Sequence, residues 1–211
     1  MAINQKKLLV LDLDGTLIFA EEKVELIYMQ VEQRHDFELE DGSILVWKRP
    51  DIDEFLEWCF EHYDIGIWSA SGSEYVHSVL SHIIPGHLRA KVKFIWTSTR
   101  CTRKYQQRGL DTYSVPITLK KLKKIWRRNR SHSPNSVAIY NRRNTLIVDD
   151  TPVTYRTNYG NAIPIISYTG NSKDSELKRI KNLLDLLLSS NDVRTMNKRV
   201  SVENVNKILL K

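Results

Sequence analysis

Short apolar runs alternate with amphipathic segments along most of the chain. The apolar runs that predict strands are residues 7–13, 65–69, 92–96, 144–148 and 163–167. Apolar positions at helical spacing predict helices over 51–63, 73–84 and 174–189, and a basic helix marked by Leu119, Leu122, Ile125 and Trp126 that runs into a polar loop at 129–136. Strands alternating with helices predict an α/β fold with a mainly parallel sheet.

Three segments depart from this alternation. Residues 19–47 carry many glutamates, and Asp41-Gly42 between two short apolar runs predicts a hairpin turn, so we expect a small flap over one end of the sheet. Residues 97–117 have no clear period and predict an irregular or hairpin insertion. Residues 190–211 predict a short helix or a loose tail, so we expect one domain over residues 1–189.

Composition places the chain among ordinary globular proteins. Of its 211 residues, 41% are hydrophobic and 27% are charged, a mixture that supports a core without disulfides. No run of 18 apolar residues suggests a membrane span, and the polar start leaves no room for a signal peptide. The two cysteines fit a reducing compartment. We therefore expect a monomer that is neither secreted nor membrane-bound and that works in the nucleus or the cytoplasm.

Charge is unevenly distributed along the chain. The formal net charge is +7, but residues 1–74 hold 17 acids against 6 bases, whereas residues 75–148 hold 16 bases and one acid, Asp111. A basic block of this kind indicates a phosphate-bearing or polyanionic partner, although a merely solvated surface explains the charge total equally well.

Polar residues follow three of the predicted strands. Asp12-Leu13-Asp14-Gly15-Thr16 comes after the first, Ser69 after the second, and Asp149-Asp150 after a later one. Ligands of an open parallel sheet bind beyond the carboxyl ends of its strands, so these side chains are expected to converge. Two carboxylates at positions i and i+2 repel each other unless a cation or a proton lies between them. The alternative is a turn, since Asp and Gly are turn residues.

This constellation resembles the haloacid dehalogenase superfamily of phosphotransferases. The matching motifs are Asp12-Leu13-Asp14-Gly15-Thr16-Leu17, Ser69 in Ile67-Trp68-Ser69-Ala70-Ser71, Lys120, and Asp149-Asp150. More narrowly, residues 48–56, Glu74-Tyr75, 146–152 and 161–165 look like the phosphatases of the RNA polymerase II C-terminal domain. Those enzymes usually carry Glu at the position of Gly15 and Thr at that of Ser69, and the insertion at 97–117 does not align with theirs.

The resemblance implies a set of roles. Asp12 is the nucleophile, Asp14 the general acid and base, and Ser69 and Lys120 hold the phosphoryl oxygens, with Lys121 as the alternative lysine. It also implies Mg²⁺, held by Asp12, Asp150 and the Asp14 carbonyl, with Asp149 binding through water; oxygen ligands of this kind suit that ion. The residues expected to orient the loop or bind the substrate are Thr16, Ser71, Arg100 and Arg103.

The predicted function is a Mg²⁺-dependent phosphoserine protein phosphatase acting on the polymerase tail and so on transcription. Two alternatives stay open. The basic middle region fits a phosphatase of nucleotides or nucleic-acid ends. A catalytically silent binding module has the same fold, but such a module has no need of the acid–base residue Asp14.

Overall fold

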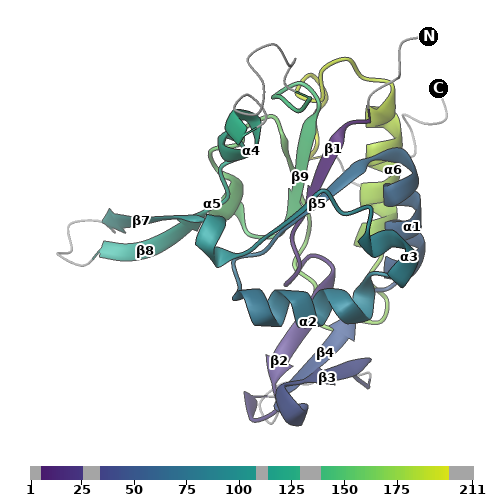
Figure 1. The fold of residues 1–211 in the computed structure, drawn as a ribbon, viewed down its shortest axis with the longest axis vertical. Coiled ribbons are helices and arrows are strands. Elements are labelled where there is room, and N and C mark those ends of the chain that lie inside the picture. The colour runs from purple at the N-terminus through teal and green to yellow at the C-terminus, as the bar shows by residue number, and fades with distance from the viewer. Residues whose placement is uncertain (1–5, 26–33, 108–113, 129–138, 200–211) are drawn as a thin grey trace.

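A five-stranded parallel sheet forms the centre of the protein (Figure 1). The structure, a computed structural model, describes residues 6–25, 34–107, 114–128 and 139–199. The sheet runs in the order β10-β9-β1-β5-β6, and all its pairs are parallel. Its strands are β1 (Leu8–Leu11), β5 (Asp64–Trp68), β6 (Phe94–Trp96), β9 (Thr145–Asp149) and β10 (Ala162–Pro164).

Helices cover both faces of this sheet, which is why its central strands are apolar throughout. Leu9 and Leu11 of β1 pack with the first group of helices, and the alternate residues Leu8 and Val10 pack with the second. The first group is α1 (Ile52–His62), α2 (Ser73–Ile83), α3 (Gly86–Arg89) and α6 (Glu176–Leu188). The second is α4 (Lys123–Arg128) and α5 (Pro152–Tyr155).

The predicted α/β organisation is confirmed, but two segments differ from the prediction. Neither Leu119 nor Leu122 belongs to the basic helix: Leu119 ends a strand, Leu122 lies in a turn, and α4 begins only at Lys123. Because Leu119 is almost fully buried, its apolar character fits either element, and spacing alone could not separate them. The strand predicted over 163–167 ends at Pro164, whose ring supplies no N–H to a continuing ladder.

The predicted flap is a small antiparallel sheet at the carboxyl end of β1, seen below α2 in Figure 1. It runs in the order β2-β4-β3, with β2 (Ile18–Glu22), β3 (Phe37–Leu39) and β4 (Ile44–Lys48). The predicted turn lies between β3 and β4 in a short 3-10 segment, η2 (Glu40–Gly42). Asp41 and Gly42 both take positive φ, 55° and 87°, as a tight hairpin connection needs.

The predicted insertion is a hairpin that projects away from the sheet, and it is displaced toward the C-terminus (Figure 1). After a 3-10 turn, η3 (Ser98–Arg100), β7 (Thr102–Gln107) pairs with β8 (Ser114–Leu119). The hairpin therefore ends at Leu119 and not at residue 117, and its second strand leads straight into Lys120.

The predicted tail begins as packed chain. Val193 is fully buried, and its N–H donates to the carbonyl of Arg143 at 2.9 Å. Residues 190–199 contain no helix. The loop predicted at 129–136 and the rest of the tail, 200–211, lie outside the described residues. No helix in the described part of the chain is long and apolar enough to cross a membrane.

A glycine in the central strand β5 accounts for the position of a neighbouring aromatic ring. Gly66 pairs with Phe94, and a Cβ built on Gly66 would lie 2.3 Å from that ring. We predict that Gly66→Ala lowers the free energy of unfolding by about 1–3 kcal/mol, because the ring must leave its place. Urea denaturation followed by circular dichroism measures the change.

Gly86→Ala is the matched control for that measurement. A Cβ on Gly86 meets nothing within 4 Å, and the residue opens the short helix α3, so its replacement should change stability by less than about 0.5 kcal/mol. Equal effects of the two substitutions would contradict the packing described for Phe94.

Candidate active site

Three neighbouring strands bring polar side chains to one edge of the parallel sheet. β1 lies between β5 and β9. Asp12 follows β1, Ser69 follows β5, and Asp149 ends β9. The carboxyl ends of parallel strands share one edge, so residues more than 130 positions apart in sequence meet there, at the position where ligands of such sheets bind. The expected convergence of these residues is observed.

A buried lysine joins two of the carboxylates. Lys120 Nζ lies 2.7 Å from Asp12 Oδ1 and 2.8 Å from Asp149 Oδ2. Lys120 and Asp149 are fully buried, and Asp12 is nearly so. The N–H of Lys120 also donates to the carbonyl of Thr154 at 2.7 Å, which fixes the backbone at this point. Lys121, the alternative lysine, is half-buried and takes no part in these contacts.

The cluster of Lys120, Asp12 and Asp149 carries one net negative charge when all three side chains are ionised. Burial raises the pKa of the Asp12 carboxyl to about 8; Lys120 opposes that rise and Asp149 adds to it. For Lys120, burial acts to lower the pKa, but the two carboxylates outweigh it and the pKa is raised, so the ammonium stays charged. A further cation bound here would favour the ionised form of Asp12.

A third carboxylate completes a site suited to a cation. Oxygens of Asp12, Asp149 and Asp150 all lie within 4.8 Å of one another. Burial raises the pKa of Asp150, a hydrogen bond from Ser167 opposes the rise, and Asp149 adds to it. Both oxygens of Asp149 accept hydrogen bonds from nitrogen donors, Lys120 and the N–H of Thr151, and the residue is fully buried. Asp150 is half-buried and accepts hydrogen bonds from the hydroxyl groups of Thr151 and Ser167. Asp150 is thus the more accessible of these two carboxylates.

Gly15 brings the loop after β1 against Asp150. Its φ is +71°, and a Cβ built on it would lie 2.3 Å from Asp150 Oδ2 and 2.7 Å from Ser167 Oγ. Any side chain here would be strained and would displace the carboxylate. The close approach of the loop and Asp150 thus explains why this chain has glycine at position 15, where resembling enzymes usually carry Glu.

Asp14 faces hydroxyl groups rather than the other acids. Its Oδ1 accepts a hydrogen bond from Tyr75 at 2.5 Å, and its Oδ2 accepts one from Ser71 at 3.0 Å and a longer one from Ser69 at 3.5 Å. Burial, followed by the charge of Asp14, raises the pKa of Tyr75, so the phenol stays protonated and donates. The sequence prediction included Ser69 and Ser71 and missed Tyr75, although Glu74-Tyr75 lies in a segment that carries the family resemblance.

A second buried cation holds the backbone of the same loop. The Arg49 guanidinium is 1% exposed and donates to the carbonyls of Gly15 at 3.2 Å and Thr16 at 3.0 Å. It also forms a two-point pair with Asp174, with both N–O distances at 2.8 Å. Thr16 itself is buried, and its hydroxyl finds no hydrogen-bond partner among the described residues. Arg49 was not predicted as a site residue, because sequence position does not show which carbonyls a side chain will reach.

The two arginines predicted to bind substrate lie outside the acid cluster. Arg100 belongs to η3, is exposed, and stacks over the ring of Trp96 with 5.6 Å between guanidinium carbon and ring centre. Arg103 is exposed on β7, opposite Thr118. Both side chains are exposed, and their contact with a substrate stays a prediction.

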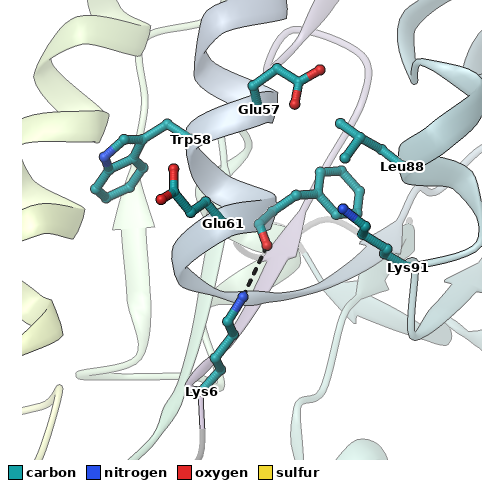
Figure 2. A pocket seen from close by; sticks show the side chains of 7 residues that line it. Lys6, Glu57, Trp58, Glu61, Leu88 and Lys91 are labelled. Atoms are coloured by element: carbon teal, nitrogen blue, oxygen red, sulfur yellow. Dashed lines mark hydrogen bonds between the residues drawn. The ribbon is translucent and has the colours of Figure 1, made fainter.

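A hollow of about 500 Å³ lies away from these acids, between α1 and α3 (Figure 2). Lys6, which lines it, precedes β1, whereas Asp12 follows that strand, so the hollow sits toward the opposite end of β1. Its lining is Lys6, Glu57, Trp58, Phe60, Glu61, Leu88 and Lys91. Lys6 Nζ donates to the Phe60 carbonyl at 3.1 Å, and none of the predicted site residues lines this hollow.

Known proteins resemble this chain over most of its length. A CTD nuclear envelope phosphatase 1 homolog of Drosophila melanogaster is 27% identical over 206 residues, which cover 94% of this chain and 74% of that protein. A protein described as CTD phosphatase-like from Invertebrate iridescent virus 3 is 37% identical over 90 residues, covering 40% of this chain and 47% of that protein.

Among solved structures, the fission yeast RNA polymerase II CTD phosphatase Fcp1, bound to beryllium fluoride, superposes with a TM-score of 0.51 and 16% identity. The match covers 98% of this chain and 62% of that one, and it confirms the expected fold of a parallel sheet flanked by helices. The sequence profile of the NLI interacting factor-like phosphatases matches residues 7–194. The expected family and its enzyme class are thereby confirmed: this chain belongs to the NLI interacting factor-like phosphatase family.

Proposed function

We propose that this chain is a metal-dependent phosphoprotein phosphatase that uses Asp12 as its nucleophile. The observation that carries the proposal is the buried ammonium of Lys120, 2.7 Å from Asp12 and 2.8 Å from Asp149, at the sheet edge where Asp14 also lies. Burying an unpaired ammonium costs folding free energy, and here two carboxylates keep Lys120 charged. A charged ammonium beside a potential nucleophile can stabilise the negative charge of a phosphoryl group, which supports phosphoryl chemistry.

The chemistry can be assigned to the chain's own residues. A carboxylate oxygen of Asp12 attacks phosphorus while the bond from phosphorus to the serine oxygen breaks, and Asp14 gives its proton to that oxygen. Asp14 then removes a proton from water, the water oxygen attacks phosphorus, and the bond to Asp12 breaks to release phosphate. Two of the three Lys120 donors contact carboxylates, which leaves one for a phosphoryl oxygen. We assign a similar contact to the Ser69 hydroxyl.

Magnesium fits the donor set, because the clustered ligand atoms are all carboxylate oxygens and three carboxyl groups face the single ammonium of Lys120. Asp12 and Asp150 would hold it directly, with Asp149 binding through water. The Asp14 carboxylate, turned toward Tyr75 and Ser71, is left to its acid–base role, and the metal contact expected of Asp14 is that of its backbone carbonyl. When bound, the ion neutralises the charge of the phosphoryl group and of its attacker.

We further propose a phosphoserine protein as the substrate, with the C-terminal domain of RNA polymerase II as the leading candidate. The names of the sequence relatives support this, since several are CTD phosphatases. Work in the nucleus or cytoplasm, and a monomeric state, remain predictions. The competing substrate class, nucleotides or nucleic-acid ends, is favoured by the basic middle region.

Asp12→Asn tests the nucleophile. We expect hydrolysis of an aryl phosphate with Mg²⁺ to fall about a thousandfold or more, because the amide is a poor nucleophile. Asp185→Asn is the matched control, since Asp185 is exposed on α6, and it should keep wild-type turnover. Asp12→Asn turnover within tenfold of the control, with an unchanged circular dichroism spectrum, would rule out the proposed nucleophile.

Ion binding can be measured without turnover. We expect Mg²⁺ to raise the melting temperature of the wild-type protein in a concentration-dependent manner, because a ligand that binds the folded state stabilises it. Asp150→Asn should need about tenfold more Mg²⁺ for the same rise, because it removes one direct ligand. Asp185→Asn should match the wild type, and a wild-type melting temperature insensitive to Mg²⁺ would contradict the proposed site.

Arg49→Lys tests the buried pair behind the catalytic loop. Lysine cannot reproduce the two-point pair with Asp174 together with the carbonyl contacts, so we expect stability to fall by about 2–4 kcal/mol and kcat by about tenfold. Lys178→Gln breaks a more exposed pair, with Asp51 at 3.3 Å, and should cost less than about 1 kcal/mol. Equal losses for both variants, measured by urea denaturation and steady-state kinetics, would refute a special role for Arg49.

A further inference from the structure

In the part of the chain that the structure describes, a group of cations beside the active site has no carboxylate partner. We call this group the basic rim; its members come from η3, β7, the turn before α4 and the start of α4, and are Arg100, Arg103, Lys104, Lys121, Lys123 and Lys124. Among the described residues, none of them forms a salt bridge. Cations elsewhere on the surface are often paired, as Lys93 is with Asp64 at 3.2 Å.

Two elements attach the basic rim to the catalytic residues. The N–H of Ser98, at the start of η3, donates to the carbonyl of Ser71 at 2.9 Å, so Arg100 stands just beyond the hydroxyl groups that face Asp14. Lys124 Nζ donates to the carbonyl of Arg100 at 2.6 Å, which ties α4 to η3. The unpaired charge is therefore held at the border of the active site.

The hairpin extends this charge outward from Lys120. Arg103 pairs with Thr118, two residues before Lys120, which corresponds to roughly 7 Å along an extended strand. Tyr105 pairs with Pro116, roughly 13 Å from Lys120 on the same scale. Side chains alternate between the two faces of a strand, so Pro116 and Thr118 lie on the same face, and the same alternation extended past β8 puts Lys120 there too. Tyr105 pairs with Pro116 and Arg103 pairs with Thr118, so both lie on that face as well.

From this arrangement we infer that the basic rim binds a second anionic group on the same substrate. That substrate is an extended, multiply phosphorylated peptide, whose second phosphate lies two to four residues from the phosphoserine in the active site. The inference rests on the proposed phosphatase function and specifies the substrate of that site. Phosphate oxygens accept strong, charge-assisted hydrogen bonds from guanidinium and ammonium groups.

The hairpin favours a peptide over a nucleic acid. In the described part of the chain β8 is the one strand that pairs with β7, so the other edge of β7 presents unused backbone N–H and C=O groups. An extended peptide can add to such an edge with the same repeat of about 3.3 Å, which keeps its side chains in step with Arg103 and Tyr105. The exposed ring of Tyr105 offers contact area beside this edge.

The test compares peptides that carry one phosphoserine with peptides that carry a second phosphoserine three residues away on either side. We expect kcat/KM to be about tenfold higher for one of the doubly phosphorylated peptides at low salt, and this preference to shrink as salt rises. In the double variant Arg100→Gln/Arg103→Gln the preference should fall about threefold to tenfold. Each value is divided by kcat/KM for an aryl phosphate, so that changes in the reaction itself cancel.

The control variant is Lys173→Gln/Lys178→Gln, which removes the same charge from exposed positions away from the basic rim and should keep the preference. A wild-type enzyme that turns over both kinds of peptide equally, or whose preference ignores salt, would overturn the inference. So would a preference reduced equally by both double variants, because that result would reflect net charge alone.

Binding measurements separate this inference from the proposed function. Fluorescence anisotropy with Asp12→Asn protein and labelled peptides measures affinity without turnover. Preferential binding of the doubly phosphorylated peptide, lost in the Arg100→Gln/Arg103→Gln background, supports the basic rim even if the wild type proves to have no phosphatase activity. Tighter binding of a 5′-phosphorylated single-stranded oligonucleotide than of either peptide would overturn the inference in favour of nucleic acid.

Discussion

The ammonium of Lys120, enclosed between Asp12 and Asp149, is the interaction on which the rest of the site depends. A charged group with no exposure to water must be paired, and these three residues come from separate segments that meet only in the folded chain. The Lys120 ammonium finds both partners only when the sheet has folded, β1 lies beside β9, and the hairpin is fixed at its base. The cluster therefore couples the fold to the catalytic geometry.

A second buried cation acts on the other side of the same loop. Lys120 contacts the side chain of Asp12, whereas Arg49 contacts the carbonyls of Gly15 and Thr16. The loop after β1 is thus held through its side chains from one direction and through its backbone from the other. Asp14, between these points, is positioned by hydroxyl donors that carry no charge, which suits a residue proposed to exchange its proton twice in each cycle.

The sequence predicted the structure best where a single requirement, such as the burial of a strand on both faces, determines the residue types. Continuous apolar runs predicted the central strands, and polar residues at their ends predicted which side chains would converge, as Asp12 and Asp149 do. Prediction failed where two elements impose the same pattern, as at Leu119, buried at a strand end and not in a helix. It also failed for Arg49 and Tyr75, because their partners are a backbone carbonyl or a carboxylate from another segment, which spacing does not encode.

The β7–β8 hairpin is fixed to the rest of the protein at its base and projects freely beyond it. At its base Leu119 is nearly fully buried, and the next residue is anchored by its N–H to the carbonyl of Thr154 at 2.7 Å. The catalytic lysine is therefore fixed by contacts with the body of the protein and not by the outer part of the hairpin. If the basic rim binds the substrate, substitutions along β7 can change the choice of target while the reacting groups stay in place.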